Sequence, residues 1–187
     1  MKSAWWMGAG RVIAVDDVED RLRFAKRYAH VETVNFRDVD VISWIKEHTE
    51  GRGADCTIDA VGCEASGSAI QRVLGVYLKA EGGSAHALNW CFHATRKGGH
   101  VSIVGVYGPP WNLVDIGTAM NKGLTIRTNQ CPVHRYMKHL LEHIRSGHLD
   151  ATGIISHRFT LEDAPSAYHI FANKLDGCIK CVLTPSA

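Results

Sequence analysis

Apolar residues follow two alternating patterns along this chain, short β-branched runs and longer segments with helical spacing. The β-branched runs predict strands at residues 11–15, 31–36, 56–61, 101–105 and 124–128. Apolar side chains three or four positions apart predict helices at residues 3–7, 18–29, 39–48, 65–78 and 86–95. Strand and helix alternate with short connections, which is the pattern of a parallel sheet with helices on both faces. The sequence therefore predicts an α/β fold.

The last third of the chain changes this alternation. Its pattern predicts a helix, a strand, a helix and a strand at residues 133–146, 154–159, 161–173 and 178–183. A break near Gln130-Cys131-Pro132 separates this part from the rest. We expect residues 1–130 to form one domain and residues 131–187 to belong to another.

Composition narrows the class of protein. Apolar residues make up 45% and charged residues 21% of the 187 positions, the balance of a soluble globular protein. The formal net charge is only +2 and no basic run exceeds a dipeptide, so nucleic acid is not an expected partner. The first seven residues resemble neither a secretory signal nor a membrane span, so we expect a cytoplasmic protein without a membrane partner. Six scattered cysteines lack the density of a disulfide-stapled domain and are expected to be reduced.

Asp16 ends the first predicted strand after the run Arg11-Val12-Ile13-Ala14-Val15. In a dinucleotide-binding βαβ unit, the acidic residue at this place accepts hydrogen bonds from the adenosine ribose. Asp17 is the better candidate for capping the next helix, which leaves Asp16 for that role. The glycine-rich turn of such a unit lies about 20 residues upstream of the acidic residue, which is before Met1. Gly8-Ala9-Gly10 precedes a strand instead of following one, so we expect a glycine there to end the first helix in a left-handed conformation.

Four motifs in this order resemble the zinc-dependent medium-chain dehydrogenases. They are Gly8 to Asp16, Asp59 to Gly62, Gly98 to Gly105 and Asp176 to Lys180. With the insertion between Lys79 and Trp90, the chain is most similar to the branch that includes glutathione-independent formaldehyde dehydrogenase. The resemblance implies a doubly wound parallel (Rossmann) sheet that lacks its first strand, followed by a returning segment of the catalytic domain. It also implies NAD as cofactor and a small alcohol or aldehyde as substrate.

The resemblance assigns residues to both ends of the dinucleotide. The adenosine end would contact Asp16, Arg21 and Val61. The nicotinamide end would contact a set of strand-end residues, which are Val104, Gly105, Val106, Thr128 and Gln130. Lys180 would reach the pyrophosphate, where the family commonly carries an arginine that forms two parallel hydrogen bonds.

The same resemblance places the catalytic zinc ligands and the proton relay on a segment that would precede this chain. We therefore expect zinc only in the complete enzyme, and we expect the chain alone not to oxidise alcohols or aldehydes. Self-association as a dimer or tetramer is expected through the edge strand Leu124 to Thr128. The rival hypothesis is a non-catalytic nucleotide-binding or subunit-interaction module.

Three further motifs invite other functions. His139-Leu140-Leu141-Glu142-His143 matches the HxxEH pattern of a metallopeptidase class, but both histidines fall outside the apolar stripe of their helix and are expected to be solvated. Cys178-Ile179-Lys180-Cys181 matches a metal or redox pattern, but residues three apart in a strand point to opposite faces, so we expect the thiols not to converge. Gly62 to Ser68 mimics a phosphate loop without its lysine. No metal site is therefore expected in this chain.

Overall fold

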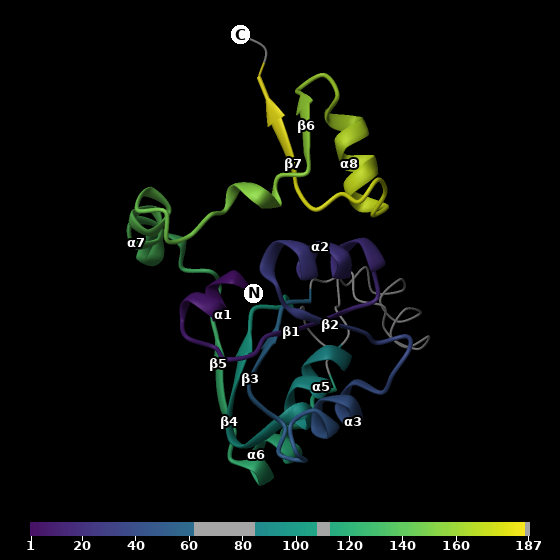
Figure 1. Ribbon diagram of the computed structural model, residues 1–187, viewed down its shortest axis with the longest axis vertical. Helices are drawn as coiled ribbons and strands as arrows, with labels where there is room; N and C mark the ends of the chain where they lie inside the picture. Colours follow the sequence, from purple (N-terminus) through teal and green to yellow (C-terminus); the bar gives the residue numbers. More distant parts are fainter. Residues whose placement is uncertain (62–84, 108–112, 186–187) are drawn as a thin grey trace. The chain divides into compact units, whose positions relative to one another are not determined.

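The computed structural model describes residues 1–61, 85–107 and 113–185 (Figure 1). These residues fold into two compact units. One unit comprises Met1–Val39 with Val133–Ala187, and the other comprises Asp40–Pro132. The predicted helix at 65–78, the stretch Gly62 to Ser68 and the first part of the insertion after Lys79 lie outside the described residues. The division into domains at residues 1–130 and 131–187 stays a prediction.

The first unit begins with four elements. They are α1 (Lys2–Trp6), β1 (Ile13–Asp16), α2 (Glu19–Ala29) and β2 (Glu32–Asn35). The two strands are parallel, with Ile13 opposite Glu32 and Asp16 opposite Asn35. Helix α2 buries Ala25 and Ala29 against Val31, and Trp5 packs on this cluster. The indole Nε1 of Trp5 donates a hydrogen bond to the carbonyl of Ala29 at 2.8 Å, which satisfies the only donor of a partly buried indole.

The end of α1 confirms the predicted role of the first glycine pair. Gly8 has φ of +89°, the left-handed region that glycine adopts without a Cβ clash. The N–H of Gly8 bonds the carbonyl of Trp5 at 2.9 Å, and the N–H of Ala9 bonds that of Ala4 at 3.0 Å. These two bonds form a Schellman motif, which turns the chain from α1 toward β1.

The second unit contains a three-stranded parallel sheet in the order β3-β4-β5. Its elements are α3 (Val41–Glu47), β3 (Ala54–Asp59), α5 (His86–Ala94), β4 (Thr95–Ile103), α6 (Ile116–Lys122) and β5 (Thr125–Thr128). Helix α5 packs on β3 and β4 (Figure 1). Its Leu88 and Phe92 meet Val101 of β4 and Ala119 of α6 in the core of this unit.

The first unit also contains the last elements of the chain. They are α7 (Val133–Arg145), the 3₁₀ turn η1 (Thr152–Ile154), β6 (His157–Thr160), α8 (Ala164–Ala172) and β7 (Cys181–Thr184). Strands β6 and β7 are parallel, and α8 packs on both. The predicted strand start at residue 178 is wrong, because a turn with positive φ values at Asp176 and Gly177 precedes an irregular segment, and β7 begins only at Cys181.

Every strand pair in the described residues is parallel, and helices connect the strands, so the predicted α/β class is confirmed. Among these residues, β1 pairs with β2 alone and β3 pairs with β4 alone. None of the helices in the described part of the chain is long and apolar enough to span a bilayer.

Candidate cofactor-binding site

The residues predicted to bind the dinucleotide lie mainly at the carboxyl ends of parallel strands. In the first unit, Asp16 ends β1 opposite Asn35, the last residue of β2. In the second unit, Asp59, Ile103 and Thr128 are register partners at the ends of β3, β4 and β5. Open α/β sheets bind their ligands outside the carboxyl ends of their strands. Each unit thus has one candidate binding edge.

Asp16 has the geometry of an acceptor held in place by its own backbone. Its Oδ1 accepts hydrogen bonds from the N–H groups of Asp17 and Val18 at 2.8 and 2.9 Å. Its Oδ2 lies 3.8 Å from Nη1 of Arg21, and the side chain is 32% exposed. One oxygen is therefore fixed, while the other keeps lone pairs available for hydroxyl donors.

The expectation that Asp17 caps α2 is wrong. The N-cap of α2 is Val18, and no side chain caps that helix end. The Oδ2 of Asp17 instead accepts hydrogen bonds from Nε and Nη2 of Arg37 at 3.1 and 2.8 Å. Arg37 follows β2, so this ion pair ties the ends of β1 and β2 together beside Asp16.

The second unit holds its binding edge together through a buried carboxylate that the sequence analysis did not assign. Asp59 is 2% exposed, and its Oδ2 accepts a hydrogen bond from the hydroxyl of Tyr107 at 2.5 Å. The carbonyl of Asp59 accepts from the N–H groups of Val104 and Gly105 at 2.8 and 2.9 Å. The segment after β4 is thereby fastened to the end of β3.

Gly105 is required by this close packing. A Cβ at this position would lie 2.5 Å from Oδ2 of Asp59 and 2.7 Å from the carbonyl oxygen of Val61. The neighbouring N–H of Val106 bonds that same carbonyl at 3.3 Å. A glycine therefore allows the backbone after β4 to cross the carboxylate in contact with it.

Two groups near Asp59, the hydroxyl of Tyr107 and the thiol of Cys91, are in their neutral forms at neutral pH. Burial, with the hydrogen bond to Asp59, holds the pKa of Tyr107 well above its usual range. Burial also raises the pKa of Cys91 to about 11, with a further contribution from the charge of Asp59. Tyr107 is thus a hydrogen-bond donor to Asp59, and Cys91 is an unreactive thiol.

The remaining predicted contacts lie on exposed or half-buried positions. Val104 and Val106 are 62% and 49% exposed, so the chain offers two apolar side chains on either side of Gly105. Val61 is half-buried, Thr128 is exposed as the last residue of β5, and Gln130 is exposed two residues beyond it. Lys180 is exposed in the segment before β7. The structure gathers Val61, the 104–106 segment and Thr128 at one edge, and it brings Arg21 to Asp16.

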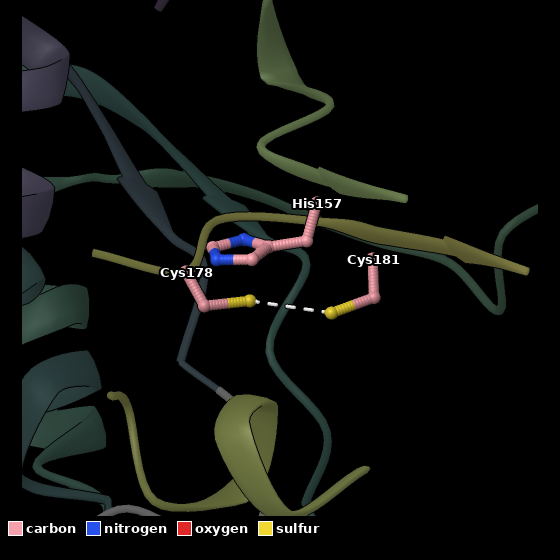
Figure 2. A group of neighbouring side chains, drawn as sticks. All are labelled: His157, Cys178 and Cys181. Carbon is pink, nitrogen blue, oxygen red and sulfur yellow. Dashed lines mark hydrogen bonds between the residues drawn. The ribbon is translucent and has the colours of Figure 1, made fainter. Parts of the chain in front are cut away.

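The predicted divergence of Cys178 and Cys181 is wrong, because Cys178 lies in a turn and not in the strand. Their sulfur atoms are 3.4 Å apart, and His157 lies beside them (Figure 2). The HxxEH histidines also lie together on α7, with 3.1 Å between the Nε2 atoms of His139 and His143. No third ligand joins them among the described residues, so the structure gives the metallopeptidase hypothesis no metal-binding group.

Helix α7 has the predicted apolar stripe, but the stripe is not buried in the described part of the chain. Its members are all more than two-fifths exposed, and they are Val133, Met137, Leu140, Leu141 and Ile144. The histidines are thus not distinguished from the stripe by exposure alone.

Comparison with known proteins gives one family and consistent relatives. Residues 1–82 match the profile of a family described as zinc-binding dehydrogenase. A zinc-type alcohol dehydrogenase-like protein of Bacillus subtilis is 43% identical over 98% of this chain, and an alcohol dehydrogenase of Cupriavidus necator is 31% identical over 95%. A solved structure of an alcohol dehydrogenase from Thermus sp. ATN1 covers 99% of the chain with a TM-score of 0.75 and 26% identity.

The chain spans less than half the length of these proteins, with 48% of the Bacillus protein, 43% of the Cupriavidus protein and 46% of the Thermus chain covered. The likeness nevertheless runs through both units, and the strand ends described above fall within it. The chain is similar to the zinc-binding dehydrogenase family, whose profile matches its residues 1–82.

Proposed function

We propose that this chain is the NAD(H)-binding part of a zinc-type alcohol dehydrogenase, which transfers hydride between NAD and a small alcohol or aldehyde. The observation that carries the proposal is the carboxylate of Asp16, fixed by two backbone N–H groups at the end of β1. The relatives named as alcohol dehydrogenases support the reaction class. A specific preference for formaldehyde rests only on the sequence motifs and the insertion after Lys79.

The residues present fit the two ends of NAD. Asp16 and Arg21 offer an acceptor and a donor to the adenosine ribose, and Val61 offers an apolar surface to the adenine side. Val104 and Val106 offer exposed apolar side chains to a flat ring, because the backbone at Gly105 is held down on Asp59. We assign the carboxamide to the backbone near Thr128 and Gln130, and the pyrophosphate to Lys180.

The bound cofactor would supply the hydride acceptor, which no protein side chain can provide. The residues of this chain bind and orient it. Asp59 and Tyr107 are positioning residues, because they fix the 104–106 segment without facing the cofactor themselves. We assign no proton transfer and no catalytic zinc ligand to this chain.

A nucleotide-binding or subunit-interaction module without catalysis would use the same contacts. The names of the relatives favour the dehydrogenase. The two hypotheses can be distinguished by the gene sequence upstream of Met1. In-frame coding sequence for a glycine-rich loop and zinc ligands would favour the dehydrogenase. Its absence from the gene would favour the non-catalytic module.

Cofactor preference tests the role of Asp16. We expect NADH to bind more tightly than NADPH, because the Asp16 carboxylate would repel the 2′-phosphate, although Arg21 offsets part of this repulsion. Replacing Asp16 by alanine should weaken NADH binding about tenfold or more, the loss expected for hydrogen bonds to a charged acceptor. Fluorescence titration of both dinucleotides measures this, with Asp38→Ala, an exposed aspartate after β2, as the control. Equal affinities for NADH and NADPH would contradict the assignment.

The free side of β5 supports a proposal for self-association. Within the described residues β5 pairs with β4 only, so its other side presents unpaired backbone groups. We propose that two copies pair through Leu124 to Thr128 across a two-fold axis. Sedimentation velocity should show a dimer or tetramer at micromolar concentration. A monomer over the whole concentration range would contradict the proposal.

A further inference from the structure

Three side chains with metal-binding chemistry meet where β6 and β7 begin (Figure 2). His157, Cys178 and Cys181 each offer one ligand atom, and these atoms all lie within 4.8 Å of one another. The two sulfur atoms are 3.4 Å apart. No other group of three or more such ligands occurs in the part of the chain that the structure describes.

The fold brings these residues together from two segments. His157 and Cys181 are direct register partners in the parallel pair β6 and β7, so their side chains leave the same face of the sheet. Cys178 joins them from the turn before β7, which follows the positive φ values at Asp176 and Gly177. The convergence is therefore a consequence of strand register and of one turn.

The backbone of the Cys178–Cys181 loop is already fixed by hydrogen bonds. The hydroxyl oxygen of Ser156 accepts from the N–H groups of Ile179 and Lys180 at 2.9 and 3.1 Å. Cys178 is only 7% exposed, so its thiol has few alternative positions. A site whose ligands are held before binding loses less conformational freedom when an ion arrives.

The chemistry of the three ligand atoms determines which metal ion the site would bind. Two thiolates and one imidazole suit a borderline-soft ion such as Zn²⁺, and they do not suit Mg²⁺ or Ca²⁺. Tetrahedral Zn–S bonds of about 2.3 Å place two sulfurs about 3.8 Å apart and a sulfur and a nitrogen about 3.5 Å apart. The sulfur pair, at 3.4 Å, is slightly closer than this, and no pair of ligand atoms is more than 4.8 Å apart, so side-chain rotations would complete the geometry.

We propose that His157, Cys178 and Cys181 form a zinc site that links β6 to the segment before β7. Binding releases the two thiol protons to solvent, the imidazole contributes a lone pair, and no electron is transferred. Water takes the fourth position. His157 has Ser156 Oγ at Nδ1 and Asp176 Oδ2 at Nε2, so whichever nitrogen does not bind the ion keeps an orienting partner. The two cysteines flank Lys180, so the ion would also fix the backbone of that lysine.

Cobalt titration tests the site without any assay of activity. The 187-residue chain is reduced, stripped with a chelator and titrated with Co²⁺, and then with Zn²⁺. We expect one Co²⁺ per chain with a thiolate-to-cobalt charge-transfer band, which Zn²⁺ abolishes. Cys178→Ser, Cys181→Ser and His157→Asn should each weaken binding about tenfold or more. Cys131→Ser and His139→Asn, exposed residues outside the group, should leave it unchanged.

The shift in melting temperature on adding Zn²⁺ tests the site even in a variant that is less stable than the wild type. Zn²⁺ should raise the melting temperature of the wild type and of Cys131→Ser, but not that of Cys181→Ser, because only a folded site binds the ion. Absence of the thiolate band in wild type, or a band of unchanged intensity and cobalt affinity in Cys178→Ser, would overturn the proposal. A chain that takes up no metal but forms a Cys178–Cys181 disulfide in air would also overturn it, in favour of a redox pair.

Discussion

Gly105→Ala is expected to destabilise the second unit by roughly 1–3 kcal/mol, the usual effect of added volume in a packed site. The new Cβ would lie 2.5 Å from Oδ2 of Asp59 and 2.7 Å from the carbonyl of Val61. The Asp59 oxygen belongs to a buried side chain and the Val61 oxygen to the backbone, so neither atom can rotate away. The 104–106 segment would therefore have to lift from β3, and NADH affinity should fall along with stability.

Chemical denaturation and NADH titration of the same variant measure both effects. Gly117→Ala in α6 is the matched control, because the nearest atom to its Cβ would be Oδ1 of Asp115 at 3.6 Å. That variant should be as stable as the wild type or slightly more so, since alanine favours a helix over glycine. If Gly105→Ala bound NADH and unfolded like Gly117→Ala, the close contact of Gly105 with Asp59 would contribute neither to stability nor to NADH affinity.

Removing the Asp59 carboxylate is expected to have a comparable effect on stability. Asp59→Ala leaves the hydroxyl of Tyr107 and the N–H of Val61 without their acceptor. An unsatisfied buried polar group costs roughly 1–3 kcal/mol. The free energy of unfolding, from denaturant titration, should fall by about that amount.

The same strand supplies the control for this substitution. Asp55 in β3 forms an ion pair with Arg96 but is 66% exposed, so Asp55→Ala should cost no more than about 1 kcal/mol. Tyr107→Phe removes the donor, so combining it with Asp59→Ala should cost less than the sum of the two single losses. Equal losses in Asp55→Ala and Asp59→Ala, or fully additive losses in the double variant, would show that Asp59 does not hold the 104–106 segment through Tyr107.

The sequence predicted the fold through features that are local. Alternating β-branched runs and helical spacing depend on neighbouring residues, and they located every described strand. The start of β4 was nevertheless wrong, because this strand begins at Thr95, six residues before the predicted start at residue 101. The position of Asp16 at the end of a strand was predicted, because the β-branched run before it indicates where the strand ends. Helix α6 was not predicted, although Asp115 caps it by accepting from the N–H of Thr118 at 3.0 Å. Its seven residues are too short for a helical period to stand out.

Features that depend on contacts distant in the chain were not predicted. The Asp59–Tyr107 pair joins residues 48 positions apart, and the only signal was an acidic residue at the end of an otherwise apolar strand. Arg37 draws Asp17 away from the helix start from 20 positions along the chain. The meeting of Cys178 with Cys181 and His157 depends on one turn and on the register of β6 with β7.

Chemical-shift mapping with NAD tests the central claim most directly, that the strand ends of this chain bind the dinucleotide. Titration of the isotope-labelled chain should shift the amides of Asp17 and Val18, which bond Asp16, and those of Val104, Gly105 and Val106. AMP, which carries only the adenosine end, should shift the first pair and leave the 104–106 segment unchanged. Saturable shifts confined to other residues, or no saturable shift with NAD, would contradict the account.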